Sequence, residues 1–185
     1  QKHIQLQEIE QALINNEICL YYQPKVNMKT GDVFGVEALL RWIHPDKGLI
    51  PPLKFLPAIQ GTSLEVLIGE WVISKALKQL KQWNEQGITL EVSVNISSYH
   101  LQQPSFVTDL EAILALYPSV STEYLQLEIL ESSALSDLQS ISNIINICID
   151  TLGINVALDD FGTGYSSLTH LRNLSAKTIK IDQTF

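Results

Sequence analysis

The feature that most constrains the fold is a regular alternation of strand-like and helix-like segments in the second half of the chain. Apolar runs typical of strands lie at residues 90–97, 124–130, 154–161 and 178–182, separated by helix-like segments at residues 106–117, 136–152 and 166–174. Each helix-like segment can carry the chain back across a sheet, so successive strands can run parallel. The alternation therefore predicts an α/β fold with a parallel sheet and helical crossovers.

The first half of the chain adds an antiparallel hairpin. Strand-like segments at residues 18–28 and 33–43 are joined by the turn-forming sequence Thr30-Gly31-Asp32, which is too short for a parallel crossover. This hairpin brings the number of predicted strands to six, with the first antiparallel to the second. The other elements expected here are helices at residues 4–14 and 64–86 and a proline-rich loop, with at most a short helix, at residues 45–57.

Composition and charge exclude several classes of protein. Of the 185 residues, 45% are apolar and 17% charged, which is typical of a globular domain with one core. The net charge of -8 argues against a nucleic-acid polymer as partner. No apolar run reaches the roughly 18 residues that cross a bilayer, so we expect no membrane contact by this segment. Cys19 and Cys148 lie far apart and are interpreted as buried apolar residues in a reducing, cytoplasmic compartment.

Polar side chains interrupt five of the predicted strands. A parallel strand buried on both faces should be continuously apolar, and an unpaired buried carboxylate is very unfavourable. One such interruption is more often a structural ion pair, but several late in their strands favour an active site, because the carboxyl ends of barrel strands converge there. The residues are Glu37, Asn95, Glu128, the adjacent Asp159 and Asp160, and Lys180 with Asp182.

Apart from Lys180, this set offers oxygen ligands and no histidine or cysteine. Oxygen ligands suit hard cations such as Mg²⁺, Mn²⁺ or Ca²⁺ rather than Zn²⁺. Five carboxylates would repel one another in one cavity, and two cations bridged by a carboxylate of the Asp159–Asp160 pair would offset that charge. Two cations about 4 Å apart can bind a phosphodiester for in-line displacement by an activated water. Lys180 fits a group that orients or helps deprotonate that water.

Several further residues have two interpretations each. Arg41 lies four residues after Glu37 and could bind a phosphate oxygen or form a surface ion pair. Gln23 could mark a sheet edge or donate a hydrogen bond to a ligand. Glu131 could brace the following loop or cap the next helix. The scattered histidines, His100 among them, are expected at the surface or in loops.

At this point the sequence resembles the EAL domain, the bacterial family of cyclic di-GMP phosphodiesterases. The resemblance extends along nearly the whole chain, in order and spacing. It rests on Glu37-Ala38-Leu39-Leu40-Arg41-Trp42, Tyr22-Gln23-Pro24-Lys25-Val26, Val94-Asn95-Ile96-Ser97, Leu127-Glu128-Ile129-Leu130-Glu131-Ser132, Asp159-Asp160-Phe161-Gly162-Thr163-Gly164 and Lys180-Ile181-Asp182.

The resemblance implies a modified TIM (β/α) barrel with an antiparallel first strand, and hydrolysis of cyclic di-GMP to linear pGpG with Mg²⁺ or Mn²⁺ in second-messenger signalling. It also implies a role for each matched residue. The ligands of one metal would be Glu37, Asn95, Glu128 and Asp159, and those of the second metal Asp159 and Asp160. Lys180, with Asp182 beside it, resembles the group that contacts the attacking water. Gln23 and Arg41 resemble substrate contacts, and Glu131 resembles the acid that holds the loop at residues 160–167.

Two departures from the family pattern affect these expectations. Gln60 stands where the family usually has Glu. The predicted barrel is also truncated after the sixth strand, so residues 1–185 are expected to be an EAL domain that is incomplete at the C-terminus. Its open edge would favour a homodimer or a longer parent with other signalling domains. Three hypotheses stay open: a phosphodiesterase active in the intact parent, an inactive cyclic di-GMP receptor or interaction module, and a structural remnant.

Overall fold

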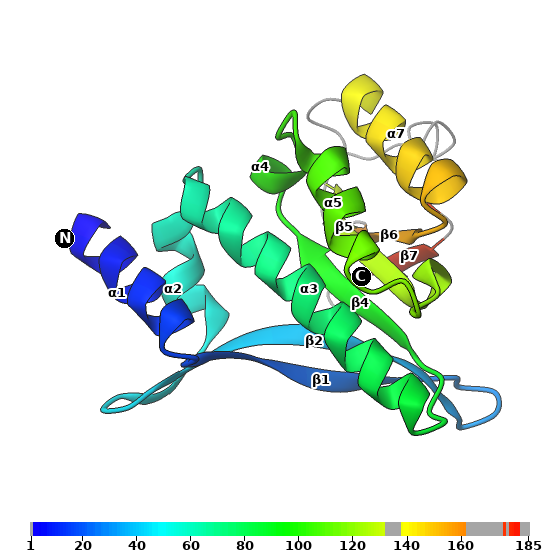
Figure 1. Ribbon diagram of the computed structural model, residues 1–185, viewed down its shortest axis with the longest axis horizontal. Coiled ribbons are helices and arrows are strands. Elements are labelled where there is room, and N and C mark those ends of the chain that lie inside the picture. The colour runs from blue at the N-terminus through cyan, green and yellow to red at the C-terminus, as the bar shows by residue number, and fades with distance from the viewer. Residues whose placement is uncertain (1, 132–137, 162–175, 177, 182–185) are drawn as a thin grey trace.

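The computed structural model describes residues 2–131, 138–161, 176 and 178–181. In these residues helices lie along a curved sheet (Figure 1). The strands follow the order β1-β2-β4-β5-β6-β7, and a short strand, β3, pairs with the end of β2. Seven strands are therefore described, one more than the six that the sequence predicts.

The additional strand follows the predicted hairpin. β1 (Ile18–Val26) and β2 (Val33–His44) are antiparallel, as expected. The chain then turns into β3 (Gly48–Ile50) and α2 (Pro52–Ile59), so the interpretation of residues 45–57 as a loop with at most a short helix is only partly right. Gly48 adopts the positive φ of 68° that this turn requires. Pro52 is tolerated because the first residues of a helix have no hydrogen-bond partner for their N–H groups.

The remaining strands are parallel and confirm the predicted alternation. They are β4 (Glu91–Ile96), β5 (Leu125–Leu130), β6 (Asn155–Phe161) and β7 (Thr178–Ile181), with β4 parallel to β2. Their register places Asn95 opposite Glu128 and Leu130 opposite Asp159. The polar residues of neighbouring strands therefore lie at similar heights in the sheet.

Helices separate most of these strands, and α3 packs against both β4 and α5. The helix expected at residues 136–152 ends as a π-helical turn, and the one expected at residues 166–174 lies outside the described residues. The helical elements are α1 (Lys2–Ile14), α3 (Ser63–Glu85), α4 (Ser98–Leu101), α5 (Phe106–Ala115), a 3₁₀ turn (Thr122–Tyr124) and α7 (Leu138–Asn146), which continues into the π-helical turn (Ile147–Thr151).

Successive residues of the strands point to opposite faces of the sheet. In β4, Val92 and Val94 are fully buried in the hydrophobic core, to which Leu80 of α3 also contributes. Ser93 and Asn95 alternate with them and point to the inner face of the curve, where both form hydrogen bonds with side chains of other strands. The fold thus has an apolar outer layer beneath the helices and a polar interior.

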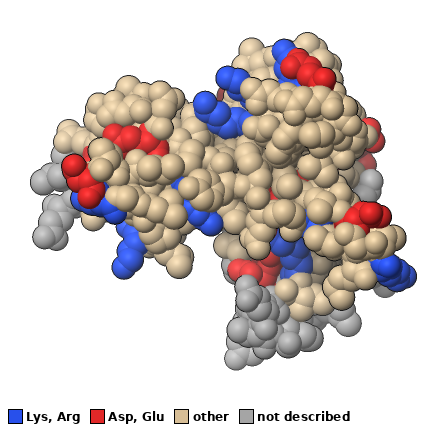
Figure 2. Space-filling model, turned by 90° about the horizontal axis from the view of Figure 1, so that it is seen from below, with Lys and Arg blue, Asp and Glu red and all other residues tan. Residues whose placement is uncertain are grey.

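Two further observations concern the helices and the charged side chains. In the part of the chain that the structure describes, every helix is too short or too polar to cross a bilayer. Figure 2 shows acidic and basic side chains in small, interspersed groups on one face. The coloured residues of that face form no continuous basic surface.

Candidate functional site

The predicted site residues come from five strands that meet in the interior of the curved sheet. Glu37 lies on β2, Asn95 on β4, Glu128 on β5, Asp159 on β6 and Lys180 on β7. In a flat sheet, β2 and β7 would be four strand spacings apart, about 19 Å. Yet the Nζ atom of Lys180 lies 3.2 Å from Oε2 of Glu37. The sheet must therefore curl as in a barrel, and this curl brings the five residues together.

Lys180 is the centre of this cluster. Its ammonium group donates to Glu128 Oε2 at 2.6 Å and to Asp159 Oδ2 at 3.0 Å, in addition to Glu37. Asn95 donates from Nδ2 to Glu37 Oε1 at 2.9 Å. Glu37, Glu128 and Asp159 each present an oxygen within 4.8 Å of the other two. The acidic groups are thus gathered around one point, with a lysine among them.

Burial and pairing act in opposite directions on the charges of this cluster. Burial raises the pKa of Glu128, whose side chain is fully buried, and the hydrogen bond from Lys180 offsets part of that effect. Burial also disfavours the charged form of Lys180, but its hydrogen bonds to Glu128 and Asp159 outweigh burial and raise its pKa. Lys180 is therefore a permanent cation at neutral pH, and it is suited to donate hydrogen bonds rather than to accept a proton.

The donor set fits a hard divalent cation. Three carboxylates and one ammonium leave the cluster with excess negative charge, which a divalent cation would neutralise. The Oε1 atom of Glu128 is buried and has no hydrogen-bond partner among the described residues. A buried carboxylate oxygen in this condition is unfavourable unless something else binds it. Glu37, Glu128 and Asp159 are the residues that could hold Mg²⁺ or Mn²⁺.

Asp160 follows Asp159 at a point where β6 leaves the regular strand conformation. It has a positive φ of 55°, and its backbone N–H donates to Asp159 Oδ1 at 2.9 Å. Neighbouring residues of a regular strand point to opposite faces, and this local turn lets Asp159 and Asp160 line the same cleft. That cleft has a volume of about 400 Å³ and is lined by Gln23, Pro24, Lys25, Glu37, Asp159, Asp160, Lys180 and Ile181.

Two other predicted site residues, Arg41 and Glu131, are not among the described residues that line this cleft. Arg41 donates from Nη1 to the carbonyl of Leu40 at 2.8 Å, and its guanidinium lies 5.7 Å from the ring centre of Tyr21. Glu131 is buried at the end of β5, 4% exposed. Asp182 and most of the loop that Glu131 is expected to hold, residues 162–167, lie outside the described residues.

A second, more apolar cavity of about 410 Å³ lies beside the cluster and shares Asn95 and Glu128 with it. Gln60, the departure from the family pattern, lines this cavity together with His100. His100 is only 2% exposed and lies on α4, so its expected place at the surface or in a loop is wrong. α4, which carries His100, has four residues, too few to show a helical period in the sequence.

The sequence analysis also missed a second polar layer beneath the first. Lys25 of β1 contacts Glu91 and Ser93 of β4 and Gln126 of β5. The signal was present in the alternation: Glu91 and Ser93 share the inward face with Asn95, and Gln126 shares it with Glu128. We refer to Lys25, Glu91, Ser93 and Gln126 as the lower layer.

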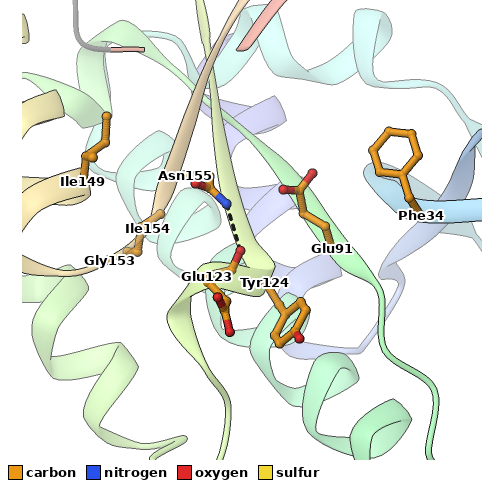
Figure 3. A pocket seen from close by; sticks show the side chains of 8 residues that line it. All are labelled: Phe34, Glu91, Glu123, Tyr124, Ile149, Gly153, Ile154 and Asn155. Carbon is orange, nitrogen blue, oxygen red and sulfur yellow. Dashed lines mark hydrogen bonds between the residues drawn. The ribbon is translucent and has the colours of Figure 1, made fainter. Parts of the chain in front are cut away.

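An opening lies at the other end of the sheet, near the amino ends of β4 to β6. Glu91 and Phe34 border it from one side, and the Nδ2 of Asn155 donates to the carbonyl of Glu123 at 2.9 Å on the other (Figure 3). Its volume is about 450 Å³, and none of the predicted site residues lines it. Barrel active sites lie at the carboxyl ends of the strands, so this opening is not the candidate site.

Comparison with known proteins places this geometry in a family. Residues 6–185 match the family model described as the EAL domain. The chain is 41% identical over 181 residues to the bifunctional diguanylate cyclase/cyclic di-GMP phosphodiesterase MucR of Pseudomonas aeruginosa, covering 97% of this chain and 26% of MucR. It is 38% identical over 178 residues to the cyclic di-GMP phosphodiesterase PdeR of Escherichia coli, covering 96% and 26%. The chain thus spans about a quarter of the length of these relatives.

Solved structures give the same result for the fold. The PaMucR phosphodiesterase in its c-di-GMP complex superposes with a TM-score of 0.90 at 40% identity, over 96% of this chain and 72% of that one. The EAL enzyme Bd1971, with cAMP and cyclic di-GMP bound, gives a TM-score of 0.88 at 33% identity, over 99% of this chain and 50% of that one. The predicted barrel-type fold class is confirmed, and the chain belongs to the EAL domain family.

Proposed function

We propose that this chain carries the hydrolytic site of a cyclic di-GMP phosphodiesterase, which opens the cyclic dinucleotide to linear pGpG with Mg²⁺ or Mn²⁺. The observation that carries the proposal is the meeting of Glu37, Glu128 and Asp159 around Lys180 in a barrel interior. The names of the relatives MucR and PdeR support the substrate. The proposed location is cytoplasmic, and a homodimer and further signalling domains remain predictions.

The reaction adds one water to one phosphodiester bond. An oxygen of water bonds to phosphorus, the bond from phosphorus to the leaving sugar oxygen breaks, and that oxygen takes up a proton. Bound divalent cations would supply Lewis acidity and lower the pKa of water. In this proposal Glu37, Asn95, Glu128 and Asp159 hold one cation, and Asp159 and Asp160 the other.

The remaining residues bind and orient the reactants. Lys180 is held as a cation by its carboxylate neighbours, so it would donate a hydrogen bond to the attacking water or to a phosphate oxygen. Gln23 lines the same cleft from β1, and its amide could donate to the phosphate. Asp182, Arg41 and Glu131 keep the roles that the family resemblance implies: assisting Lys180, contacting substrate, and holding the loop after β6.

A second candidate is a cyclic di-GMP receptor without hydrolytic activity. Two observations favour it: Lys180 already pairs with all three carboxylates, and Gln60 replaces a charged residue in the cavity beside them. In a receptor the Lys180 ammonium group would permanently occupy the position of the divalent metal ion. The two candidates differ in whether a divalent cation binds the cluster and whether product forms.

Chromatographic detection of pGpG separates these candidates. The purified chain is incubated with cyclic di-GMP and Mn²⁺, with EDTA in a parallel sample. We expect pGpG only with Mn²⁺, no turnover by the isosteric variant Glu128→Gln, and unchanged turnover by Glu111→Gln, which alters an exposed residue of α5. Binding of the dinucleotide without product would favour the receptor. Full activity of Glu128→Gln would remove this residue from the site.

A further inference from the structure

We propose that Lys25 is a positioning residue, which holds the floor of the metal site through Ser93 and Gln126 of the lower layer. The inference rests on the proposed function, because it assigns to Lys25 a role in the cation affinity of the cluster above. Lys25 belongs to β1, at the edge of the sheet opposite β7, and its side chain contacts Ser93 two strands inward and Gln126 three strands inward.

The ammonium group of Lys25 is fully engaged. It donates to Glu91 Oε1 at 2.7 Å, to the Ser93 hydroxyl and to Gln126 Oε1 at 3.4 Å. The Ser93 hydroxyl in turn donates to Gln126 Oε1 at 2.8 Å. Ser93 is fully buried and Gln126 is 5% exposed, so bulk water cannot take the place of the hydrogen bonds between these side chains. The closed set of donors and acceptors fixes the direction in which each side chain points.

The backbone around Lys25 is shaped to let its side chain pass. Gly35 of β2 lies between Lys25 and Glu91 in the register of the sheet. A Cβ at Gly35 would come within 2.8 Å of the Glu91 carbonyl and 3.0 Å of Lys25 Cε. The absence of a side chain there leaves room for the lysine stem to cross β2, while the Phe34 ring lies 5.5 Å from the ammonium group.

The lower layer is coupled to the site by the register of the strands. Ser93 pairs with Gln126 across β4 and β5, and two residues further along the same strands Asn95 pairs with Glu128. Ser93 also pairs with Glu37, one of the acidic residues, across β2 and β4. Because the Ser93 hydroxyl receives a hydrogen bond from Lys25, its own single hydrogen points away from Lys25 and is donated to Gln126.

A purely structural ion pair between Lys25 and Glu91 makes the opposite prediction for cation binding. Glu91 borders the opening in Figure 3, at the amino ends of the strands. An ion pair that only stabilised this end of the sheet would affect the acidic cluster only by long-range electrostatics. Through space, the positive charge of Lys25 repels a divalent cation, so its removal would tighten cation binding. A positioning role requires that removal weakens it. The sign of the change therefore separates the two.

The experiment measures Mn²⁺ affinity directly, from the electron paramagnetic resonance signal of free Mn²⁺ titrated with purified chain. Lys25→Met removes the charge and keeps the stem, and Lys81→Met, at an exposed residue of α3, is the control. We expect Lys25→Met to bind Mn²⁺ about tenfold more weakly, as for other residues that orient metal ligands, and the control to match wild type. Ser93→Ala should weaken binding in the same direction, and the double variant should weaken it little further, because both changes act on one chain of contacts.

Each outcome decides the matter. Weaker Mn²⁺ binding by Lys25→Met, at a temperature where the chain is folded by circular dichroism, supports the positioning role. Unchanged or tighter binding overturns it, even if the variant is less stable. If Lys25→Met does not fold, Ser93→Ala decides by the same criterion. Failure of the wild-type chain to bind Mn²⁺ would refute the proposed metal site itself, which is a separate result.

Discussion

Replacing Lys180 with methionine tests whether the three carboxylates need a cation among them. The variant keeps most of the side-chain volume and removes the charge, leaving Glu37, Glu128 and Asp159 without their shared partner. In the absence of divalent cations, mutual repulsion should then destabilise the fold. A divalent cation should restore what the lysine supplied, because it binds the same oxygens.

The size of the effect follows from the burial of the pairs. Removing one partner of a buried ion pair destabilises by about 3–5 kcal/mol, while exposed pairs contribute about 0–1 kcal/mol. The side chain of Lys180 is 29% exposed and that of Glu128 is fully buried, so we expect a loss of about 2–3 kcal/mol. For a chain of 185 residues this corresponds to a fall in Tm of about 4–12 °C.

Thermal unfolding with EDTA and with excess Mn²⁺ measures both effects. Mn²⁺ at about one hundred times its Kd should stabilise the folded chain by about 2.7 kcal/mol, enough to offset the loss in Lys180→Met. The variant should gain more from Mn²⁺ than wild type, because no ammonium group competes for the carboxylates. Lys47→Met, which removes a surface partner of Glu8, is the control and should change Tm little. A Tm equal to wild type in EDTA, or a smaller gain from Mn²⁺ in the variant, would refute this reasoning.

Three further substitutions test the fold around the site. Gly35→Ala would place a Cβ 2.8 Å from the carbonyl of Glu91, and urea unfolding should show a destabilisation of about 1–3 kcal/mol. Burial lowers the pKa of His100, so its imidazole binds a proton more readily in the unfolded chain. The free energy of unfolding should therefore fall as pH drops through about 6.5, and His100→Gln should lessen this fall between about pH 7.5 and 5.5. Leu80→Ala, at a fully buried position, should cost about 2–5 kcal/mol in urea unfolding, whereas Leu53→Ala, at an exposed one, should cost less than about 0.5 kcal/mol.

The parallel half of the fold could be predicted because its strands and helices have different periods. Asn95 and Glu128 were identified from the sequence as polar interruptions of apolar strands, and the register of β4 and β5 places them opposite each other. The short elements could not be predicted in this way. β3 has three residues, and α2 begins and continues through prolines, so neither shows a period that differs from a loop.

Contacts within the site depended on information that local sequence does not hold. Lys25 and Gln126 are 101 residues apart, and Lys180 and Glu37 are 143 residues apart. Whether such side chains meet is decided by strand order and by the curl of the sheet, which follow from the packing of all the helices together. The sequence could therefore nominate the acidic residues and Lys180 for one site, but it could not show that the Lys180 ammonium group contacts three of the carboxylates.

The two lysines of the interior have related positions, and this bears on how the site is formed. Lys25 extends inward from β1 and Lys180 from β7, the two ends of the strand order, and both reach carboxylates that belong to strands between them. Each of these two contacts spans two strand spacings, about 10 Å, which a lysine and a glutamate side chain can bridge together. The contact of Lys180 with Glu37 spans four spacings, so it forms only when the β7 edge of the sheet curls inward. Because the half-buried carboxylate of Glu37 gains this cation only in the curled sheet, the pairing favours the curled sheet over a flat one. The contact between Lys180 and Glu37 thus stabilises the barrel curvature as well as resulting from it.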